Sequence, residues 1–371
     1  MEDQRTGWLD WFSRRLGLTE IFSLLTSYGF FHAELDHRKE PRAALTEALS
    51  RPMPSYAQWP RVLGLLALIL VGVLGFTGVL LTLYYTPTPE GAHSSTATIL
   101  GEVHFGGFVY QVHYWGAQLL IAVLLVRVVR FFLQGVYRAP RELVWVCAAL
   151  TLLVAFHSEL TGRVLPWTGD GYWSGVRALE VVQAIPVYGS MAAFFSGTQG
   201  VAISELTLLR FYIFHIAAFP ILLLLLIYLH FSSVRRVGLD PSGEKVREQV
   251  GLKEHLVNLA IVLTGLVGVL VTLGILAPQF LPAAADPYAT LPGVSPPWYL
   301  LAPFGLFELT AGWLPRWVAG SILLIATTAF VFAPFLLGRF DGKNSRGLLI
   351  GLACLALATW IALTVYGADV S

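Results

Sequence analysis

Two stretches decide the fold: HYWGAQLLIAVLLVRVVRF at residues 113–131 and HIAAFPILLLLLIYLH at residues 215–230. Each belongs to an apolar run long enough to cross a bilayer, which takes about 20 residues for about 30 Å of hydrocarbon. Each run also contains ionisable residues, which are costly in lipid and therefore indicate function. These residues are His113, Arg127, His215 and His230.

The spacing of these four residues indicates a cofactor site. His113 and Arg127 are 14 positions apart, and His215 and His230 are 15 apart, so each pair spans roughly 21–23 Å along one helix face. Both spans run in the same direction, so we expect His113 and His215 at the same outer leaflet. Two imidazoles facing each other across a bundle predict bis-histidine ligation of haem. The alternative for each histidine alone is a hydrogen-bonded structural role.

Small residues favour the same interpretation, because a haem edge between helices requires close approach of the backbone. Gly64 and Gly78 are 14 positions apart on the first apolar run, and Gly162 lies near the outer end of the third. The position 14 residues before Gly162 is Ala148. Glycine is common in membrane helices, so this pattern only supports the histidine argument.

The composition is that of a membrane protein along the whole chain. Hydrophobic residues make up 56% and charged residues 13% of the 371 residues, against about 25% charged residues in soluble proteins. We predict an all-α integral membrane protein with seven transmembrane helices, comprising an N-terminal four-helix haem-binding bundle and three C-terminal helices. The predicted spans are residues 61–84, 108–133, 142–163, 207–232, 256–277, 316–337 and 346–366.

The chain divides into four predicted parts. Residues 1–60 are a cytoplasmic segment, in which residues 7–25 predict an amphipathic helix on the membrane surface; a disordered tail is the alternative. Residues 61–233 form the four-helix bundle, residues 234–255 a cytoplasmic linker, and residues 256–371 the three-helix domain.

Basic residues predict the orientation in the membrane. Most of the 24 Lys and Arg residues precede the first span or lie in the loops after the second, fourth and sixth spans. The N-terminus is therefore predicted to be cytoplasmic and the C-terminus outside, in a bacterial inner membrane. The formal charge of +1 gives no support for a nucleic-acid partner. Cys147 and Cys354 are too few for a disulfide framework or a cysteine-ligated metal cluster.

Longer motifs resemble the cytochrome b/b6 family. Residues 113–143 resemble the family's second span, and TGRVLPWTGDGYW at 161–173 resembles its outer quinol-site segment. DPYATLPGVSPPWYLLAPF at 286–304 resembles the start of the C-terminal half, which is a separate subunit in b6f complexes and is fused here. The resemblance covers residues 7–366. It implies haem b, a quinone/quinol pair, an iron–sulfur protein and/or a c-type cytochrome as partners, and a homodimer.

The resemblance also implies roles for particular residues. His113 and His215 would ligate the outer haem, Gly78 and Gly162 would leave room for it, and Arg210 would steady a propionate. We expect the second ring nitrogen of each ligand to donate to a backbone carbonyl or a hydroxyl, which fixes the ring orientation.

The inner haem site departs from the family pattern. Arg127 stands where a second histidine belongs, so His230 loses its expected partner, and Ala148 replaces a glycine. Arg130, which in the family pairs with an inner propionate, is retained. An arginine is no ordinary neutral nitrogen ligand, although its long stem can reach headgroups or a propionate. Three interpretations stay open: no inner haem, a five-coordinate haem on His230, or a haem with another ligand.

The quinol motif departs as well. The family reads Pro-Glu-Trp-Tyr where this chain reads Pro-Pro-Trp-Tyr, and Pro297 cannot accept a proton. We expect Trp298 and Tyr299 to line the pocket, with Glu159 or Glu308 as the substitute base. The alternative is that both carboxylates are solvated or interfacial charges.

Two functions from different classes follow. The first is an electron-transfer subunit of a quinol:cytochrome c oxidoreductase complex, passing electrons between quinol/quinone and a redox partner at the outer face. A gap of about 20 Å without an inner cofactor argues against a full Q-cycle in it. The second is a scaffold subunit with a vestigial cofactor site. A transporter is disfavoured, because the sequence has no broken-helix repeat or acidic midplane cluster.

Overall fold

The computed structural model describes residues 43, 53–54, 59–198, 200, 202–238, 249–250, 252–289, 293–337 and 343–371. Almost all of the predicted segment 1–60, with its surface helix, and most of the predicted linker 234–255 lie outside these residues.

The chain divides into two units. The first unit is Met1–Ile69 with Ser242–Val269, and the second is Leu70–Pro241 with Leu270–Ser371. The described part of the first unit contains the antiparallel pair of β1 (Met53–Pro54) and β2 (Gln249–Val250). It also contains the first parts of two long helices that end in the second unit. These are α4 (Trp59–Thr82) and α12 (Leu252–Leu276).

The second unit holds the rest of the helices. In chain order they are α5 (Pro89–Gly101), α6 (Gly106–Gln134), α7 (Glu142–Val164), α8 (Gly169–Gln183), α9 (Tyr188–Ser196), α10 (Glu205–Ile213), the π-turn η2 (Phe214–Ala218), α11 (Phe219–Val237), the 3-10 turn η3 (Trp298–Leu300), α13 (Leu301–Thr310), α14 (Arg316–Val331), α15 (Ala333–Leu337) and α16 (Lys343–Asp369).

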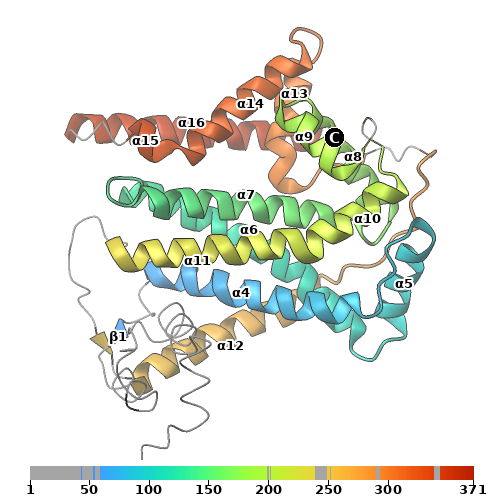
Figure 1. The fold of residues 1–371 in the computed structure, drawn as a ribbon, viewed down its shortest axis with the longest axis horizontal. Helices are drawn as coiled ribbons and strands as arrows, with labels where there is room; N and C mark the ends of the chain where they lie inside the picture. Colours follow the sequence, from blue (N-terminus) through green and yellow to red (C-terminus); the bar gives the residue numbers. More distant parts are fainter. Residues whose placement is uncertain are drawn as a thin grey trace, which may run out of the picture. The chain divides into compact units, whose positions relative to one another are not determined.

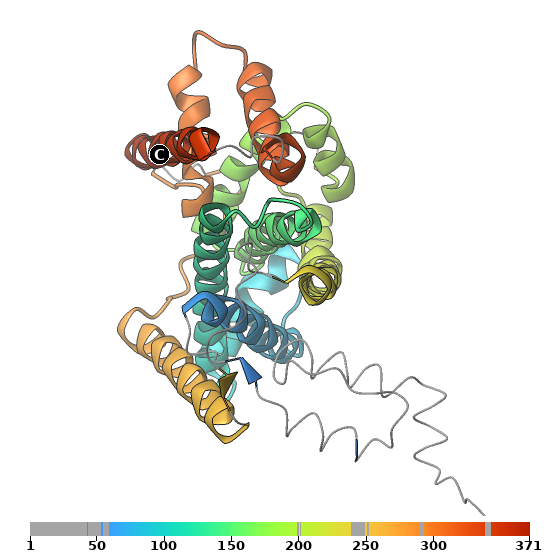
Figure 2. The ribbon, with the colours of Figure 1, turned by 90° about the vertical axis from the view of Figure 1, so that its left-hand side faces the viewer.

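Helix α7 is the centre of the bundle. It packs against both α6 and α11, and the three helices lie side by side in Figure 1. Figure 2 views α7 and α11 nearly end-on. Of the candidate spans, α7 has the largest buried share, 61% of its most apolar window. The side chains of α7 therefore face neighbours on several sides, and the candidate sites gather around it.

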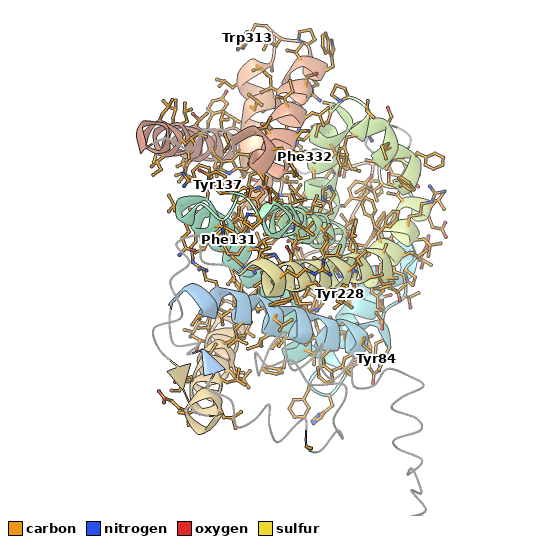
Figure 3. All side chains as sticks on the ribbon, turned by 60° about the vertical axis from the view of Figure 1, so that its left-hand side comes forward. Tyr84, Phe131, Tyr137, Tyr228, Trp313 and Phe332 are labelled. Carbon is orange, nitrogen blue, oxygen red and sulfur yellow. The ribbon has the colours of Figure 1, made fainter. Side chains whose placement is uncertain are left out.

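Six of the described helices are long and apolar enough to cross a membrane. They are Val62–Thr82, Gly106–Gln134, Glu142–Val164, Glu205–Val234, Leu256–Leu276 and Gly347–Asp369. Their outer faces carry apolar side chains such as Tyr228, which is 44% exposed, whereas Phe131 inside the bundle is 1% exposed (Figure 3). This inside-to-outside pattern suits helices surrounded by lipid.

The predicted span 316–337 is not one helix. It is divided at Phe332 into α14 and α15. Pro334 has no N–H to donate to the Phe330 carbonyl one turn back, and Trp145 Nε1 of α7 donates to that carbonyl instead, at 2.9 Å. The proline breaks the helix, and an indole from the bundle satisfies the acceptor that it leaves.

Helices α13 and α16 cross closely through two glycines. A Cβ on Gly305 would lie 2.3 Å from the Leu363 carbonyl oxygen, and one on Gly367 would lie 2.2 Å from that of Leu301. Only glycine permits such an approach of two backbones. The crossing holds the C-terminal helix against the short helix that follows η3.

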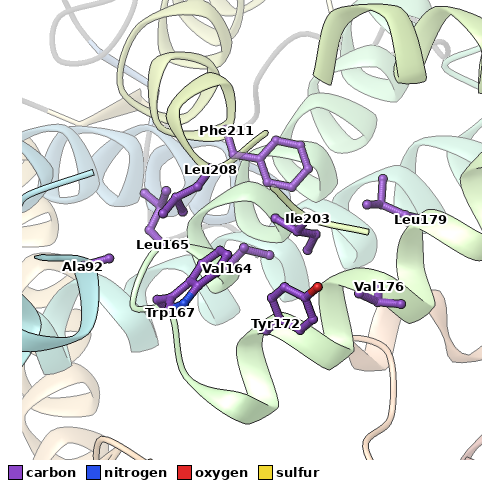
Figure 4. Close-up of a cluster of buried hydrophobic side chains, with 10 residues drawn as sticks. All are labelled: Ala92, Val164, Leu165, Trp167, Tyr172, Val176, Leu179, Ile203, Leu208 and Phe211. Atoms are coloured by element: carbon purple, nitrogen blue, oxygen red, sulfur yellow. The ribbon is translucent and has the colours of Figure 1, made fainter. Parts of the chain in front are cut away.

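The segment after α7 is anchored by an apolar cluster, shown in Figure 4. Trp167 within it has φ 51°, which is uncommon for a residue with a side chain. Its carbonyl accepts from the Ala285 N–H at 2.9 Å, and the Tyr85 hydroxyl donates to the Leu165 carbonyl at 2.6 Å. The cluster consists of Ala92, Val164, Leu165, Trp167, Tyr172, Val176, Leu179, Ile203, Leu208 and Phe211.

Candidate functional site

His113 and His215 come together in the structure. His113 lies on α6 and His215 on η2, and their ring centroids are 6.0 Å apart with an interplanar angle of 69°. A metal–imidazole bond is about 2 Å long, so this separation fits one metal ion between the two rings. The predicted pairing of these residues across the bundle is therefore present in the fold.

The second ring nitrogen of each histidine is held as predicted. His215 Nδ1 donates to the Ser158 carbonyl at 2.8 Å, and His113 Nδ1 lies 2.9 Å from the Thr77 hydroxyl. The Thr77 hydroxyl gives its own hydrogen to the Val73 carbonyl at 2.7 Å, so it can accept from His113. Within the described part of the chain neither Nε2 has a protein partner. Both Nε2 lone pairs are thus left for a metal.

The helix that carries His215 is widened at that residue. The Phe219 N–H donates to the Phe214 carbonyl five residues back, so η2 is a π-turn. Pro220 follows and cannot donate to the Ile216 carbonyl. Single π-turns occur often at functional sites. The turn was not predicted from the sequence, where Pro220, five residues after His215, is the available signal.

Two glycines make room for the histidine rings. A Cβ on Gly162 would lie 2.4 Å from His215 Cε1, and one on Gly78 would lie 3.3 Å from His113 Cε1. The first distance is incompatible with the observed ring position, and the second is tight. The histidine pair, the fixed Nδ1 atoms and these glycines together fit a haem.

The inner pair has a different arrangement. Arg127 Nη2 donates to His230 Nε2 at 2.5 Å, and His230 Nδ1 donates to the Val144 carbonyl at 3.1 Å. Arg127 is 9% exposed and His230 is 3% exposed. The Phe131 ring stacks on His230 with an interplanar angle of 11°, and the Arg127 guanidinium carbon lies 5.0 Å from the Phe131 centroid.

These residues do not fit a second bis-histidine haem. Arg127 takes the His230 nitrogen that would bind iron, and Ala148, which is 3% exposed, stands on the neighbouring face of α7. In this structure the Arg127 guanidinium contacts His230. The side chain turns inward because the neutral imidazole offers a buried acceptor.

The remaining predicted cofactor residues are Arg210, Arg130 and Gly64. Arg210 donates to the carbonyls of Phe194 at 3.0 Å and Phe195 at 3.3 Å, so its Nη1 caps the end of α9. The Arg130 guanidinium carbon lies 5.7 Å from the Phe131 centroid. Gly64 is on the first part of α4, which belongs to the first unit of the chain.

Tyr299 and Glu159, which are 140 positions apart, are in direct contact. The Tyr299 hydroxyl donates to Glu159 Oε2 at 2.5 Å and contacts the Phe156 carbonyl at 3.0 Å. Its ring stacks on that of Phe156 with centroids 4.6 Å apart. Burial, together with the Glu159 carboxylate, raises the pKa of Tyr299 well above its usual value. Tyr299 therefore keeps its proton and acts as a donor.

The other carboxylate oxygen of Glu159 has two donors. Arg163 Nη2 lies 2.6 Å and Gln118 Nε2 2.9 Å from Glu159 Oε1. Trp298 Nε1 donates to Gln118 Oε1 at 2.8 Å, and Trp298 is 42% exposed. The contacts form a chain from an exposed indole to a carboxylate that is only 8% exposed.

Glu308 does not join this network. It is partly buried on α13, and its side chain has no polar partner within the described residues. Nine positions along η3 and α13 separate it from Tyr299, which is about 13 Å of helix. Of the two carboxylates that the sequence offered, the structure brings Glu159 to the tyrosine.

A histidine–tyrosine pair lies on another face of α7. His157 Nε2 contacts the Tyr188 hydroxyl of α9, and His157 Nδ1 donates to the Leu153 carbonyl at 2.6 Å. Burial raises the pKa of Tyr188 to about 12. Both ring nitrogens of His157 are therefore engaged, and no sequence pattern predicts its tyrosine partner.

The comparisons with known proteins now identify the family. Residues 48–238 match the family model described as cytochrome b/b6/petB. The chain belongs to the cytochrome b/b6 family. It is 32% identical over 206 residues to cytochrome b6 of Rippkaea orientalis (strain PCC 8801 / RF-1), a match that covers 55% of this chain and 92% of that protein. To cytochrome b6 of Heliomicrobium gestii it is 33% identical over 181 residues, 48% of this chain and 84% of the relative.

The fold likeness to a solved structure extends over almost the whole of this chain. A chain of the solved structure described as "Hyperthermophilic respiratory Complex III" covers 98% of this chain with a TM-score of 0.69. The match covers 99% of that chain, at 21% sequence identity. The C-terminal helices, which lie beyond the family-model match, therefore share the fold as well. The protein is an integral membrane cytochrome b, a family whose cofactor is haem b.

Proposed function

We propose that this cytochrome b is the haem-carrying subunit of a membrane redox complex that takes electrons from a quinol and passes them to a partner at the outer face. The observation that carries the proposal is the pair of His113 and His215, which have fixed Nδ1 atoms and Nε2 atoms left for a metal. A bound haem would supply one-electron transfer there. The protein supplies the two imidazoles and the space that Gly78 and Gly162 leave.

The proposed haem content is one bis-histidine haem per chain. The contact of Arg127 with His230 Nε2 supports this number, because a guanidinium does not ligate iron. It also removes the cofactor that would carry electrons to the inner face. A full two-branch Q-cycle within this chain is therefore not part of the proposal.

Glu159 is proposed as the base of the quinol pocket. A quinol beside Trp298 and Tyr299 must release protons as it is oxidised, and Pro297 cannot take one. The Tyr299 hydroxyl already donates to Glu159 Oε2, so a proton passed to Tyr299 would move along that bond. Arg163 and Gln118 hold the carboxylate in place from its other oxygen.

The proposal includes the membrane arrangement predicted from the sequence. It has seven crossings, with α14 and α15 together forming the sixth of them, over about 33 Å of helix. The N-terminus would be cytoplasmic and the C-terminus outside, in a bacterial inner membrane. An iron–sulfur protein and/or a c-type cytochrome would be the redox partners, and the subunit would be a homodimer, as family membership suggests.

A scaffold function is the second candidate. The observation that favours it is again the contact of Arg127 with His230 Nε2, which supports the loss of one haem site of the family in this chain. In that case the outer pair would be a remnant as well. The subunit would anchor peripheral redox proteins without carrying electrons.

Haem quantification on the purified protein tests these functions against each other. One haem per chain and one low-spin bis-histidine signal in the low-temperature EPR spectrum is the expected result. Two low-spin bis-histidine signals with all ligands from this chain would contradict the single-haem proposal. A protein that is fully assembled with its partners but has no haem would favour the scaffold.

A further inference from the structure

Arg163 carries a buried hydrogen-bond donor that has no acceptor among the described residues. Its Nη2 donates to Glu159, whereas its Nε is buried and has no partner within the described part of the chain. Buried donors are almost always satisfied, and an exception indicates a missing partner. A guanidinium can donate from Nε and Nη2 to two different acceptors. The free Nε can therefore bind a second acceptor without disturbing Glu159.

The position of Arg163 is next to the outer histidine pair. It directly follows Gly162, whose lack of a side chain leaves room for the His215 ring. Its Nη2 contacts Glu159, and the same carboxylate accepts from Gln118, five residues after His113 on α6, and from Tyr299. Arg163 thus lies in the last turn of α7, one residue after the glycine that lies against His215 and in contact with Glu159 of the proposed quinol pocket.

The charged groups of haem indicate the chemical class of the acceptor for Arg163 Nε. Haem b carries two propionate carboxylates, and a carboxylate placed in a buried region requires a cation or several donors. Arg210 Nη1, on the other nearby element, is engaged by the carbonyls of Phe194 and Phe195. Arg163, which follows the glycine that lies against His215, has a buried donor without a partner in the described part of the chain.

We infer that Arg163 binds a propionate of the outer haem through Nε while its Nη2 holds Glu159. The inference rests on the proposed function, since it requires a haem between His113 and His215. This contact would complete one continuous chain of hydrogen bonds from the propionate through Arg163 and Glu159 to Tyr299. The electron acceptor and the proton acceptor of the proposed quinol reaction would then share one arginine.

The test uses Arg163→Gln in the full-length protein with its haem. Removing a cation beside the haem favours the oxidised state, so the ratio of reduced to oxidised haem at a fixed potential should fall about tenfold, or ~59 mV for one electron. The propionate-bending band in the resonance Raman spectrum should shift as well. Arg177→Gln is the matched control, because Arg177 pairs with Glu180 on α8 and should change neither readout.

A second variant, Arg163→Lys, separates the effect of the charge from that of the Nε donor. Arg163→Lys keeps the charge but replaces the Nε donor, so it should shift the Raman band and change the potential little; if Arg163→Gln does not assemble, this band decides. An unchanged band at equal haem content would overturn the inference. A band that responds only when quinone is present would make a quinone carbonyl the acceptor, and would overturn it too. A wild-type protein without low-spin haem would instead mean that the proposed function has failed.

Discussion

At each end of the bundle a histidine donates from Nδ1 to a backbone carbonyl of α7, but the residue that faces this histidine differs. At the outer end two histidines from α6 and η2 leave both Nε2 atoms open, and Gly162 makes the space. At the inner end Arg127 occupies the position of one histidine and uses the Nε2 of the other. His230 keeps its Nδ1 bond to the Val144 carbonyl, just as His215 keeps its bond to Ser158. His230 is thus oriented in the same way as His215, and Arg127 holds the Nε2 that a metal would use.

The comparison indicates which residues distinguish the two candidate haem sites. The backbone carbonyls of α7 orient a histidine at both ends, so orientation alone does not distinguish them. What differs is whether the ring nitrogen that faces the cofactor is available and whether α7 has a glycine or an alanine at that level. Both differences can be tested by exchanging single residues between the two ends.

Removing a ligand should have the largest effect. His113→Ala leaves His215 as the only imidazole of the outer pair, so the low-spin bis-histidine signal should disappear from the EPR and absorption spectra. His230→Ala is the matched variant at the inner end and should leave the signal unchanged. A His113→Ala protein that retains the wild-type low-spin spectrum would show that the haem is not held by this pair.

The glycine on α7 gives the next largest effect. In Gly162→Ala the new methyl group would lie 2.4 Å from His215 Cε1, so the ring must move away from its ligating position. We expect loss of most of the low-spin haem, measured as haem per protein. Ala148→Gly, 14 residues earlier on the same helix, should leave haem content unchanged. Equal haem content in both variants would contradict the role given to Gly162.

Proton chemistry should be restricted to the outer end. Glu159→Gln keeps the size and one acceptor oxygen but removes the base, so quinol oxidation should slow roughly 10²-fold or more and its pH profile should shift. Glu308→Gln is the control, because Glu308 lies outside the contact network of Tyr299. Normal turnover in Glu159→Gln would leave the pocket without its proposed base, and a loss confined to Glu308→Gln would reverse the assignment.

The sequence predicted the bundle and its outer site because both depend on local patterns. Apolar runs define spans, and a histidine 102 positions after another on a parallel span can be placed at the same depth from helix rise alone. The prediction of one helix over 316–337 was wrong, because the helix is interrupted at Phe332, next to Pro334. Trp145 of the distant helix α7 donates to the Phe330 carbonyl, which Pro334 cannot reach with an N–H. Such compensation leaves no local signal.

The contacts that complete the site were less accessible from the sequence. Glu159 was one of two candidate bases, and only the fold shows that the Tyr299 hydroxyl reaches it and not Glu308. The partner of His230 was expected to be lost, whereas Arg127 both removes the ligand and supplies a donor to the remaining ring. Side-chain direction within a bundle depends on packing from several helices, which no single stretch of sequence contains.

The smallest expected effect is a gain at the inner end. Arg127→His restores an imidazole opposite His230 and releases the His230 Nε2 that Arg127 occupies. Ala148 still places a methyl group on α7, so the single variant should bind little inner haem, and the double variant Arg127→His with Ala148→Gly should bind more. The measurement is haem per chain with a second low-spin EPR signal, and the outer signal serves as the internal reference. If the double variant stays at one haem while the outer site is intact, then Arg127 is not what closes the inner end, and the difference between the two ends must be sought in the packing around Phe131, whose ring stacks on His230.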